Sequence, residues 1–307
     1  MNSTATLILT TLLAVSRVSA SSIYLSNEVS NRGVSYYDLV TGAYQGSVPG
    51  TYTTPTELAF DSSGNLFFSD ANVSSHVTFK FDPSTNTVTP FVTLPNGAYG
   101  IAFDPAGNLY ITTPSSGMVY KYSSSGVLLG SVSVPGARGL SYNPVDGNFY
   151  VATTPTSSAS SNQIVRLTTS LIATTFATTH LNQARTTAID AAGNIVVTNG
   201  VQNGAVEAFA LSGAYLGSIA ANVMSANQPA FTSGGLYPFY VTEFGSNDVL
   251  KCTAANTCSV FLSQGPGTGT GGLAIGPTAI PEPASGVSLS LALAGLAATA
   301  ASRRRNP

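Results

Sequence analysis

Apolar and small polar residues alternate in short runs along most of the chain, and the same run returns at a regular spacing. The run "ELAFDSSGNLFFSDA" from Glu57 is followed by "GIAFDPAGNLYITTP" from Gly100, "GLSYNPVDGNFYVAT" from Gly139 and "TTAIDAAGNIVVTNG" from Thr186. A fifth run, "PAFTSGGLYPFYVTEFG" from Pro229, keeps the outline with a changed turn. Alternation with a period of two predicts β-strands whose two faces are packed differently.

The repeat length predicts the architecture. Four Gly-Asn pairs mark the same turn in successive units, with spacings of 43, 40 and 46 residues, at Gly64, Gly107, Gly147 and Gly193. Within one unit, "GIAFD" precedes a turn that suits a tight hairpin, and "NLYITT", "MVYKYS" and "VLLGSVSV" follow. Four strands in a unit of 40 to 46 residues predict the blades of a β-propeller rather than a helical array.

The number of blades follows from the two ends of the repeating region. Five complete units run from Glu57 to about Ser263. The segment "GLAIG" ending at Gly276 looks like a lone first strand, and "IYLSN", "GVSYYDL" and "YQGSV" near the N-terminus look like a second, third and fourth strand. We therefore expect an all-β, six-bladed propeller over residues 21–276, closed by pairing of its N- and C-terminal strands.

The repeat "GIAFDPAGNLYI" is similar to NHL-type units, and residues 21–276 as a whole resemble six-bladed propellers of the NHL and SMP-30/gluconolactonase-like group. The resemblance implies the propeller fold. It also implies two classes of function, because many relatives bind partners without catalysis, while others are lactonases or lyases with a divalent ion in the central channel.

The N-terminal segment has the pattern of an export signal. An apolar stretch from Ala5 to Val15 precedes Val18-Ser19-Ala20, small residues at the positions that a signal peptidase reads. This pattern predicts residues 1–20 as a signal peptide and a mature chain outside the cytoplasm. A buried N-terminal helix is the alternative.

The C-terminal segment has the pattern of a membrane span. Residues 284–302 carry no charge and would make a helix of roughly 28 Å, close to the hydrocarbon core of about 30 Å. Three arginines follow, Arg303, Arg304 and Arg305, which the positive-inside rule keeps on the cytoplasmic side. With an exported N-terminus, the propeller would lie on the other side of the inner membrane.

The order Pro281-Glu282-Pro283, apolar span, arginine cluster, chain end resembles the PEP-CTERM sorting signal. The resemblance implies recognition by an exosortase-type membrane protease, cleavage near the triplet, and transfer to the cell surface or release into an extracellular matrix, often one rich in exopolysaccharide. Residues 277–283 would be the linker. An ordinary C-terminal anchor with a Pro-rich linker is the alternative.

Composition and charge narrow the partners. Only 8% of the residues are charged, against about a quarter in an average soluble domain. Between Ala20 and Pro283 the chain has 7 Lys and Arg against 13 Asp and Glu, a net charge of −6. No basic run occurs before the terminal arginines, so we expect no nucleic-acid partner. An acidic, hydroxyl-rich surface suits a carbohydrate matrix.

The two cysteines occupy a predicted hairpin. Cys252 and Cys258 flank "TAANT", and a hairpin there would bring their side chains face to face. An exported protein would hold them as a disulfide. A metal pair is the poorer alternative, because neither His76 nor His180 is near in sequence.

Candidate chemistry gathers at the strand ends that face the channel. The loops before each first strand and after each second strand would open on one face, and they carry Glu57, Tyr99, Arg138, Arg185 and Gln228, and Asn27, Glu28, Asp70, Asn199 and Glu243. Oxygen ligands from Glu57, Asp70, Asn199 and Glu243 would hold Ca²⁺, and Arg138 with Arg185 would hold an anionic group. The alternative is that these polar side chains cap hairpins.

The sequence favours binding over catalysis. It contains no Gly-x-Ser-x-Gly elbow, phosphate loop or His-rich metal motif. Of the lactonase pattern, only Glu57 in "TPTELAFD" stands for the glutamate of the "EGP" motif, and Asn96-Gly97 is displaced from the "NG" position. We expect a non-catalytic surface or matrix protein that binds polysaccharide or protein. A divalent-metal lactonase or hydrolase is the alternative.

Overall fold

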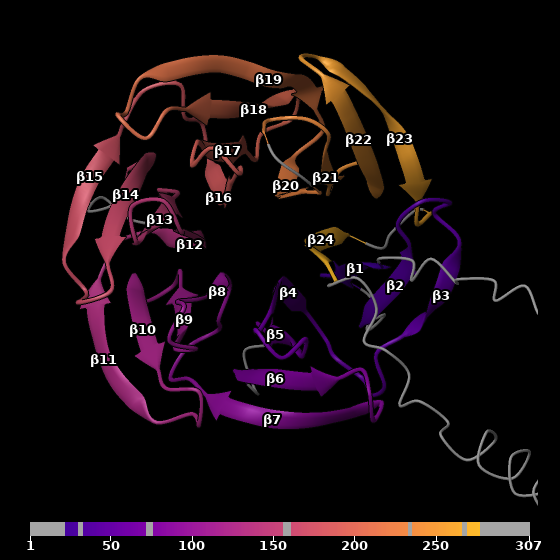
Figure 1. Ribbon diagram of the computed structural model, residues 1–307, viewed down its shortest axis with the longest axis vertical. Coiled ribbons are helices and arrows are strands. Elements are labelled where there is room, and N and C mark those ends of the chain that lie inside the picture. The colour runs from indigo at the N-terminus through magenta and orange to yellow at the C-terminus, as the bar shows by residue number, and fades with distance from the viewer. Residues whose placement is uncertain are drawn as a thin grey trace, which may run out of the picture.

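The chain folds as a ring of six blades around a central channel (Figure 1). The computed structural model describes residues 22–29, 33–71, 76–155, 161–232, 235–265 and 269–276. These residues form six antiparallel sheets of four strands each. The all-β, six-bladed propeller predicted from the repeat is confirmed. The predicted signal peptide, linker, sorting triplet and terminal span lie outside the described residues.

Each blade has its first strand on the channel and its fourth strand on the outside of the ring. Blade 1 holds β4 (Pro55–Phe60), β5 (Leu66–Asp70), β6 (Val77–Asp82) and β7 (Thr87–Thr93). Blade 2 holds β8 (Ile101–Phe103), β9 (Leu109–Thr113), β10 (Met118–Tyr122) and β11 (Leu128–Ser133). Blade 3 holds β12 (Ala137–Asn143), β13 (Asn148–Thr153), β14 (Gln163–Thr168) and β15 (Ala173–Ala177). Blade 4 holds β16 (Ala184–Ile189), β17 (Ile195–Asn199), β18 (Gly204–Phe209) and β19 (Tyr215–Val223). Blade 5 holds β20 (Ala226–Phe231), β21 (Phe239–Glu243), β22 (Asp248–Ala254) and β23 (Thr257–Ser263). Blade 6 holds β24 (Thr270–Ile275), β1 (Ser22–Asn27), β2 (Val34–Asp38) and β3 (Tyr44–Ser47).

Blade 6 closes the ring with strands from both ends of the repeating region. The C-terminal β24 pairs with β1, with Ile23 opposite Ile275 and Leu25 opposite Leu273. The N–H of Gly276 also donates to the carbonyl of Ser22 at 2.8 Å. The predicted closure is therefore confirmed, and no sheet is left open at a seam between the first and last blades.

The repeated Asp-to-Asn turns stabilise the hairpins between first and second strands. In blade 1, Asp61 Oδ1 accepts from the N–H of Asn65 at 2.8 Å, and Asp61 Oδ2 accepts from Asn65 Nδ2 at 2.8 Å. The same pair recurs as Asp104 with Asn108 and as Asp190 with Asn194. These side chains hold their own turns, so this part of the repeat is structural.

Apolar and aromatic side chains fill the space between blades. Phe67 of blade 1 meets Phe103 of blade 2 with ring centroids 4.9 Å apart, and Tyr24 of blade 6 meets Phe60 of blade 1 at 5.2 Å. Edge-to-face contacts of this kind add to the stabilisation from buried area.

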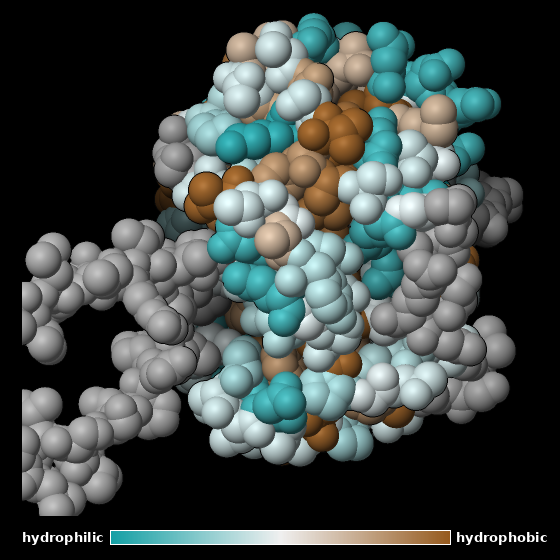
Figure 2. All heavy atoms as spheres, turned by 90° about the vertical axis from the view of Figure 1, so that its right-hand side faces the viewer, coloured by the Kyte–Doolittle hydropathy of each residue, from teal (hydrophilic) through white to brown (hydrophobic). Residues whose placement is uncertain are grey.

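The outer surface near β3 and β23 is covered mostly by polar and weakly polar residues, with apolar ones in small groups (Figure 2).

The cysteine pair lies as the hairpin predicts. Cys252 of β22 is opposite Cys258 of β23, and the two sulfur atoms are 2.03 Å apart. Within the described ranges, no helix is long and apolar enough to cross a membrane.

Candidate functional site

Five of the inner strands, including β24, are irregular near their first residues, and in four of them polar side chains stand at the irregularity. The register with the second strand shifts between Pro55 and Leu58 in β4 and between Ala137 and Leu140 in β12. The same shift occurs near the start of β16 and of β20. Each shift inserts one extra residue, and such a bulge re-aims the side chains around it. The residues at these bulges are Thr56, Glu57, Arg138, Gly139, Arg185, Thr186, Asn227 and Gln228.

Two arginines from neighbouring blades meet aromatic rings at this end of the channel. The Cζ of Arg138 lies 5.0 Å from the centroid of the Tyr99 ring, and the Cζ of Arg185 lies 5.4 Å from the centroid of the Phe244 ring. An aromatic face attracts a guanidinium and fixes its plane. Arg138 Nε is buried and has no hydrogen-bond partner among the described residues. This enclosed Nε leaves only the terminal nitrogens of the guanidinium for a ligand.

A hydrogen-bonded chain joins three further blades beside the arginines. Asn227 Nδ2 donates to Glu28 Oε1 at 3.0 Å, and the Tyr99 hydroxyl donates to Asn227 Oδ1 at 3.1 Å. Burial raises the pKa of the Glu28 carboxyl, while Arg185, the bond from Asn227, and Arg138 oppose this rise. We call Glu28, Tyr99, Arg138, Arg185, Asn227 and Phe244 the polar end.

Glu57 lies deeper in the channel and is almost fully enclosed. Its side chain is 1% exposed, and neither carboxyl oxygen has a partner with hydrogen-bond geometry among the described residues. Burial raises the pKa of Glu57 to about 8, and the nearby Thr186 hydroxyl opposes the shift only in part. Burial therefore favours the neutral form of the Glu57 carboxyl.

The channel narrows at the level of Glu57. A Cβ atom at Gly139 would collide with Glu57 Oε1 and with the side chain of Thr186. The side chain of Gln228 bridges inner strands at the same level by bonding to Leu58 and Leu273. This waist separates the polar end from the opposite half of the channel.

A hollow of about 430 Å³ adjoins the polar end between blades 1 and 2. It shares Tyr99 with the polar end, and its other lining residues are Ala71, His76, Asn96, Gly97, Ala98, Pro114 and Ser115. His76, Asn96 and Ser115 bring polar side chains to this hollow. A ligand held by the arginines would have room to continue into it.

The predicted calcium ligands are not brought together. Asp70 accepts from the backbone N–H groups of Thr53 and Thr54, both at 3.0 Å. Asn199 accepts from the N–H of Asn182 at 2.9 Å, and Glu243 accepts from the N–H of Met224 at 2.7 Å. Each is the last residue of its blade's second strand and bonds to the loop before that blade's first strand.

These three residues therefore cap loops, as the alternative interpretation held. In the part of the chain that the structure describes, no group of three or more His, Cys, Asp or Glu side chains could hold a metal ion. The calcium site predicted from Glu57, Asp70, Asn199 and Glu243 does not fit this geometry. The side-chain oxygens of the last three accept hydrogen bonds from backbone N–H groups in three different blades. Arg138 and Arg185 lie beside the Tyr99 and Phe244 rings, and their role in binding an anion stays a prediction.

The remaining predicted positions divide between the channel and the periphery. Gln228 forms part of the waist. Asn27 Nδ2 donates to the carbonyl of Gly33 at 3.2 Å and so holds its own loop. The ring of His180 stacks on Tyr215 with centroids 3.6 Å apart, away from the polar end. Asn227 and Phe244 were not predicted from the sequence, although Asn227 immediately precedes Gln228, which was.

Solved structures of several proteins share the fold of this chain. A virginiamycin B lyase from Staphylococcus aureus is 16% identical with a TM-score of 0.59, and the match covers 84% of this chain and 89% of that one. The structure of a nidogen/laminin complex gives 15% identity and a TM-score of 0.64, covering 85% of this chain and 100% of that one. A protein of unknown function from Bacteroides caccae gives 11% and 0.62, covering 83% and 98%.

The likeness establishes the fold. No protein-family model and no curated protein matches the chain. A lyase and a component of a protein complex share the architecture, so the fold does not decide between catalysis and binding. The function has to be argued from the channel.

Proposed function

We propose that this chain is an exported, non-catalytic binding propeller whose polar end holds the acidic groups of an extracellular polysaccharide. The observation that carries the proposal is the pair Arg138 and Arg185, each set against an aromatic ring on the channel. A guanidinium held in a fixed plane presents parallel N–H donors that match a carboxylate or a sulfate.

Charge and hydrogen bonding favour an acidic sugar over an acidic apolar ligand. The two arginines stand out from a body of net charge −6. Beside them, the partly exposed Glu28 carboxyl supplies acceptors that suit sugar hydroxyls. The buried Asn227 amide and Tyr99 hydroxyl hold this carboxyl in place through their hydrogen bonds. The adjoining hollow of about 430 Å³ gives space for a neighbouring sugar unit.

Delivery to the cell surface fits the geometry of the ring. Gly276 and Ser22 lie side by side at the end of β24. The other end of β24 lies at the polar end: Gly271, near its start, is so close to Glu28 that a Cβ there would collide with the Glu28 side chain. The segments 1–21 and 277–307 therefore join the ring at the end away from the arginines. An anchor in the inner membrane would point the polar end outward, before and after an exosortase-type protease acts on the Pro281-Glu282-Pro283 segment.

The alternative of a divalent-metal lactonase or hydrolase receives no support from the geometry. Asp70, Asn199 and Glu243 hold loops in three different blades, as described above, and the hollow that His76 lines has no carboxylate among its lining residues. The binding proposal needs only residues that the fold does bring together.

Binding of acidic polysaccharides tests the proposal. We expect the full chain to bind polygalacturonate or alginate in a salt-sensitive manner and to bind a neutral glucan far more weakly. Arg138→Ala and Arg185→Ala should each weaken binding by about tenfold or more, because each removes charge-assisted hydrogen bonds. Arg166→Ala is the matched control, since Arg166 is exposed on β14. Equal binding by the two channel variants and the control would refute the proposal.

Sorting is tested separately. N-terminal sequencing of the exported protein should begin at Ser21, and mass spectrometry should place its C-terminus near Pro283. Replacement of Glu282 by Ala should leave an uncleaved, membrane-bound form. Cleavage that is unchanged in this variant would argue against the exosortase.

A further inference from the structure

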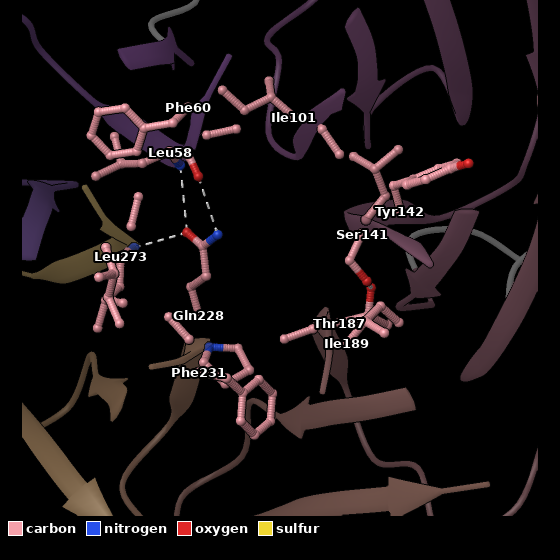
Figure 3. A pocket seen from close by; sticks show the side chains of 18 of the residues that line it. Leu58, Phe60, Ile101, Ser141, Tyr142, Thr187, Ile189, Gln228, Phe231 and Leu273 are labelled. Atoms are coloured by element: carbon pink, nitrogen blue, oxygen red, sulfur yellow. Dashed lines mark hydrogen bonds between the residues drawn. The ribbon is translucent and has the colours of Figure 1, made fainter. Parts of the chain in front are cut away.

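The half of the channel opposite the polar end is a chamber of about 380 Å³ (Figure 3). This volume is in the range of small-molecule sites, roughly 300 to 1,000 Å³. All six blades line it through three consecutive residues of each inner strand. These residues are 58–60, 101–103, 140–142, 187–189, 229–231 and 273–275, with Gln228 at the waist. We call this space the apolar chamber.

The lining favours a neutral ligand. None of the lining residues is charged, and a charged ligand would lose its hydration there without gaining a counter-charge. The last residue of each inner-strand triplet is large, apolar or aromatic, and partly exposed: Phe60, Phe103, Tyr142, Ile189, Phe231 and Ile275. Each of them also packs against the core between two blades, so only its exposed part offers apolar or aromatic surface to a ligand, and polar atoms make up more of the exposed lining.

The walls also carry backbone hydrogen-bonding groups. Each inner strand is the edge of its sheet and pairs with a neighbour on one side only. The other row of N–H and C=O groups therefore faces the channel, and such edges bind any group that can donate and accept in the same way as a peptide.

The carboxamide of Gln228 forms hydrogen bonds with the backbone N–H and C=O groups of these edges. Its carboxamide oxygen accepts from the N–H of Leu273 at 2.8 Å and from the N–H of Leu58 at 3.4 Å, and its nitrogen donates to the carbonyl of Leu58 at 3.4 Å. Figure 3 shows this amide lying between two inner strands. One amide thus bonds to two blades at once.

We propose that the apolar chamber binds a small neutral molecule that carries a carboxamide on an apolar body. The amide pairs with the free edges of the inner strands, as Gln228 does, and the apolar body lies among the large side chains of the chamber. This site is independent of the acidic-polysaccharide proposal, because it uses other residues at the other end of the channel.

The probe is N-acetyl-tryptophanamide, a neutral diamide with an aromatic body. The chain contains no Trp, so the emission of the probe is read without a tryptophan background from the protein. We expect a saturable blue shift on titration with the full chain. The acid form, N-acetyl-tryptophan, and indole, which has no amide, should each bind about tenfold more weakly.

Two variants place the probe in the apolar chamber. Ala188 and Ala230 line it from different blades and are partly exposed, so Ala188→Phe and Ala230→Phe should each fill space and weaken binding by about tenfold or more. The use of two blades keeps the test valid if one variant fails to fold, which the melting temperature reports. Arg138→Ala is the control and should bind the probe like the wild type.

Three results would overturn the proposal: no saturable shift, equal affinity for the charged acid, or wild-type affinity in a folded chamber variant. Loss of probe binding in Arg138→Ala would move the site to the polar end. Loss of polysaccharide binding with retained probe binding would refute the proposed function alone.

Discussion

Glu57 should make the stability of the ring fall as the pH rises. Burial raises the pKa of its carboxyl from 4.5 to about 8. The folded state therefore holds the proton more tightly than the unfolded chain does. The resulting stabilisation is complete below the unfolded pKa and is lost as the pH rises through the folded pKa.

The magnitude follows from the difference between the two pKa values. At about 1.4 kcal/mol per pKa unit, the shift corresponds to a loss of about 5 kcal/mol between pH 4.5 and pH 8. No discount for solvent is needed, because the side chain is 1% exposed. Such a loss is comparable to the total stability of many domains, about 5 to 15 kcal/mol.

Glu57→Gln separates this effect from other titrations. The variant keeps the shape of the side chain and removes its proton equilibrium. The free energy of unfolding in urea, measured in steps from about pH 4 to about pH 9, should rise in the variant relative to the wild type by about 5 kcal/mol across this range. Any constant cost of the buried amide cancels in the comparison.

Asp38→Asn is the control. Hydrogen bonds from Thr41 lower the pKa of the Asp38 carboxyl, so this group is ionised in both the folded and unfolded states above about pH 5 and should not alter the slope there. The reasoning is refuted if Glu57→Gln and the wild type lose stability in parallel between pH 5 and pH 8. That result would mean that Glu57 is ionised in the folded protein at neutral pH.

Three further predictions concern single contacts. Replacing Cys252 and Cys258 by Ser should lower the free energy of unfolding by about 2 kcal/mol, because a disulfide would close a loop between residues six positions apart. In urea, the wild type in reducing agent should have the same free energy of unfolding as the variant. Gly139→Ala should cost about 1 to 3 kcal/mol, since its Cβ would collide with Glu57 and Thr186 at the waist, and an unchanged melting curve would contradict this. Gly200→Ala should weaken acidic-polysaccharide binding by about tenfold without a comparable loss of stability, because the new methyl group would displace the Arg185 side chain.

The architecture could be predicted because the sequence pattern of one blade recurs along the chain. All five complete units carry the same alternation, and three of them carry the same Asp-to-Asn turn, so a weak pattern in one unit is supported by the others. The closing blade could be predicted for a related reason. The C-terminal segment supplies a first strand alone, and the N-terminal segment supplies a second, third and fourth strand. These can complete a blade only by pairing with each other, and Ile23 lies opposite Ile275 in that pairing.

The site was harder to predict because a sequence position does not say what a side chain turns toward. Asp70 and Glu243 end equivalent strands, as a ring of ligands would, yet both accept backbone N–H groups of their own blades. Asn227 was missed for a different reason. The prediction used one position before each first strand, which is Gln228 in this blade, whereas the bulge in β20 holds both Asn227 and Gln228.

The two ends of the channel differ because the inner strands are irregular at one end and regular at the other. Bulges near the start of four inner strands bring charged and amide side chains such as Arg138, Arg185 and Asn227 to the polar end. Beyond the waist the strands return to a regular ladder, so the channel there is lined by sheet edges and by side chains without charge. Side chains therefore dominate recognition at the polar end, and the backbone has a larger part in the apolar chamber.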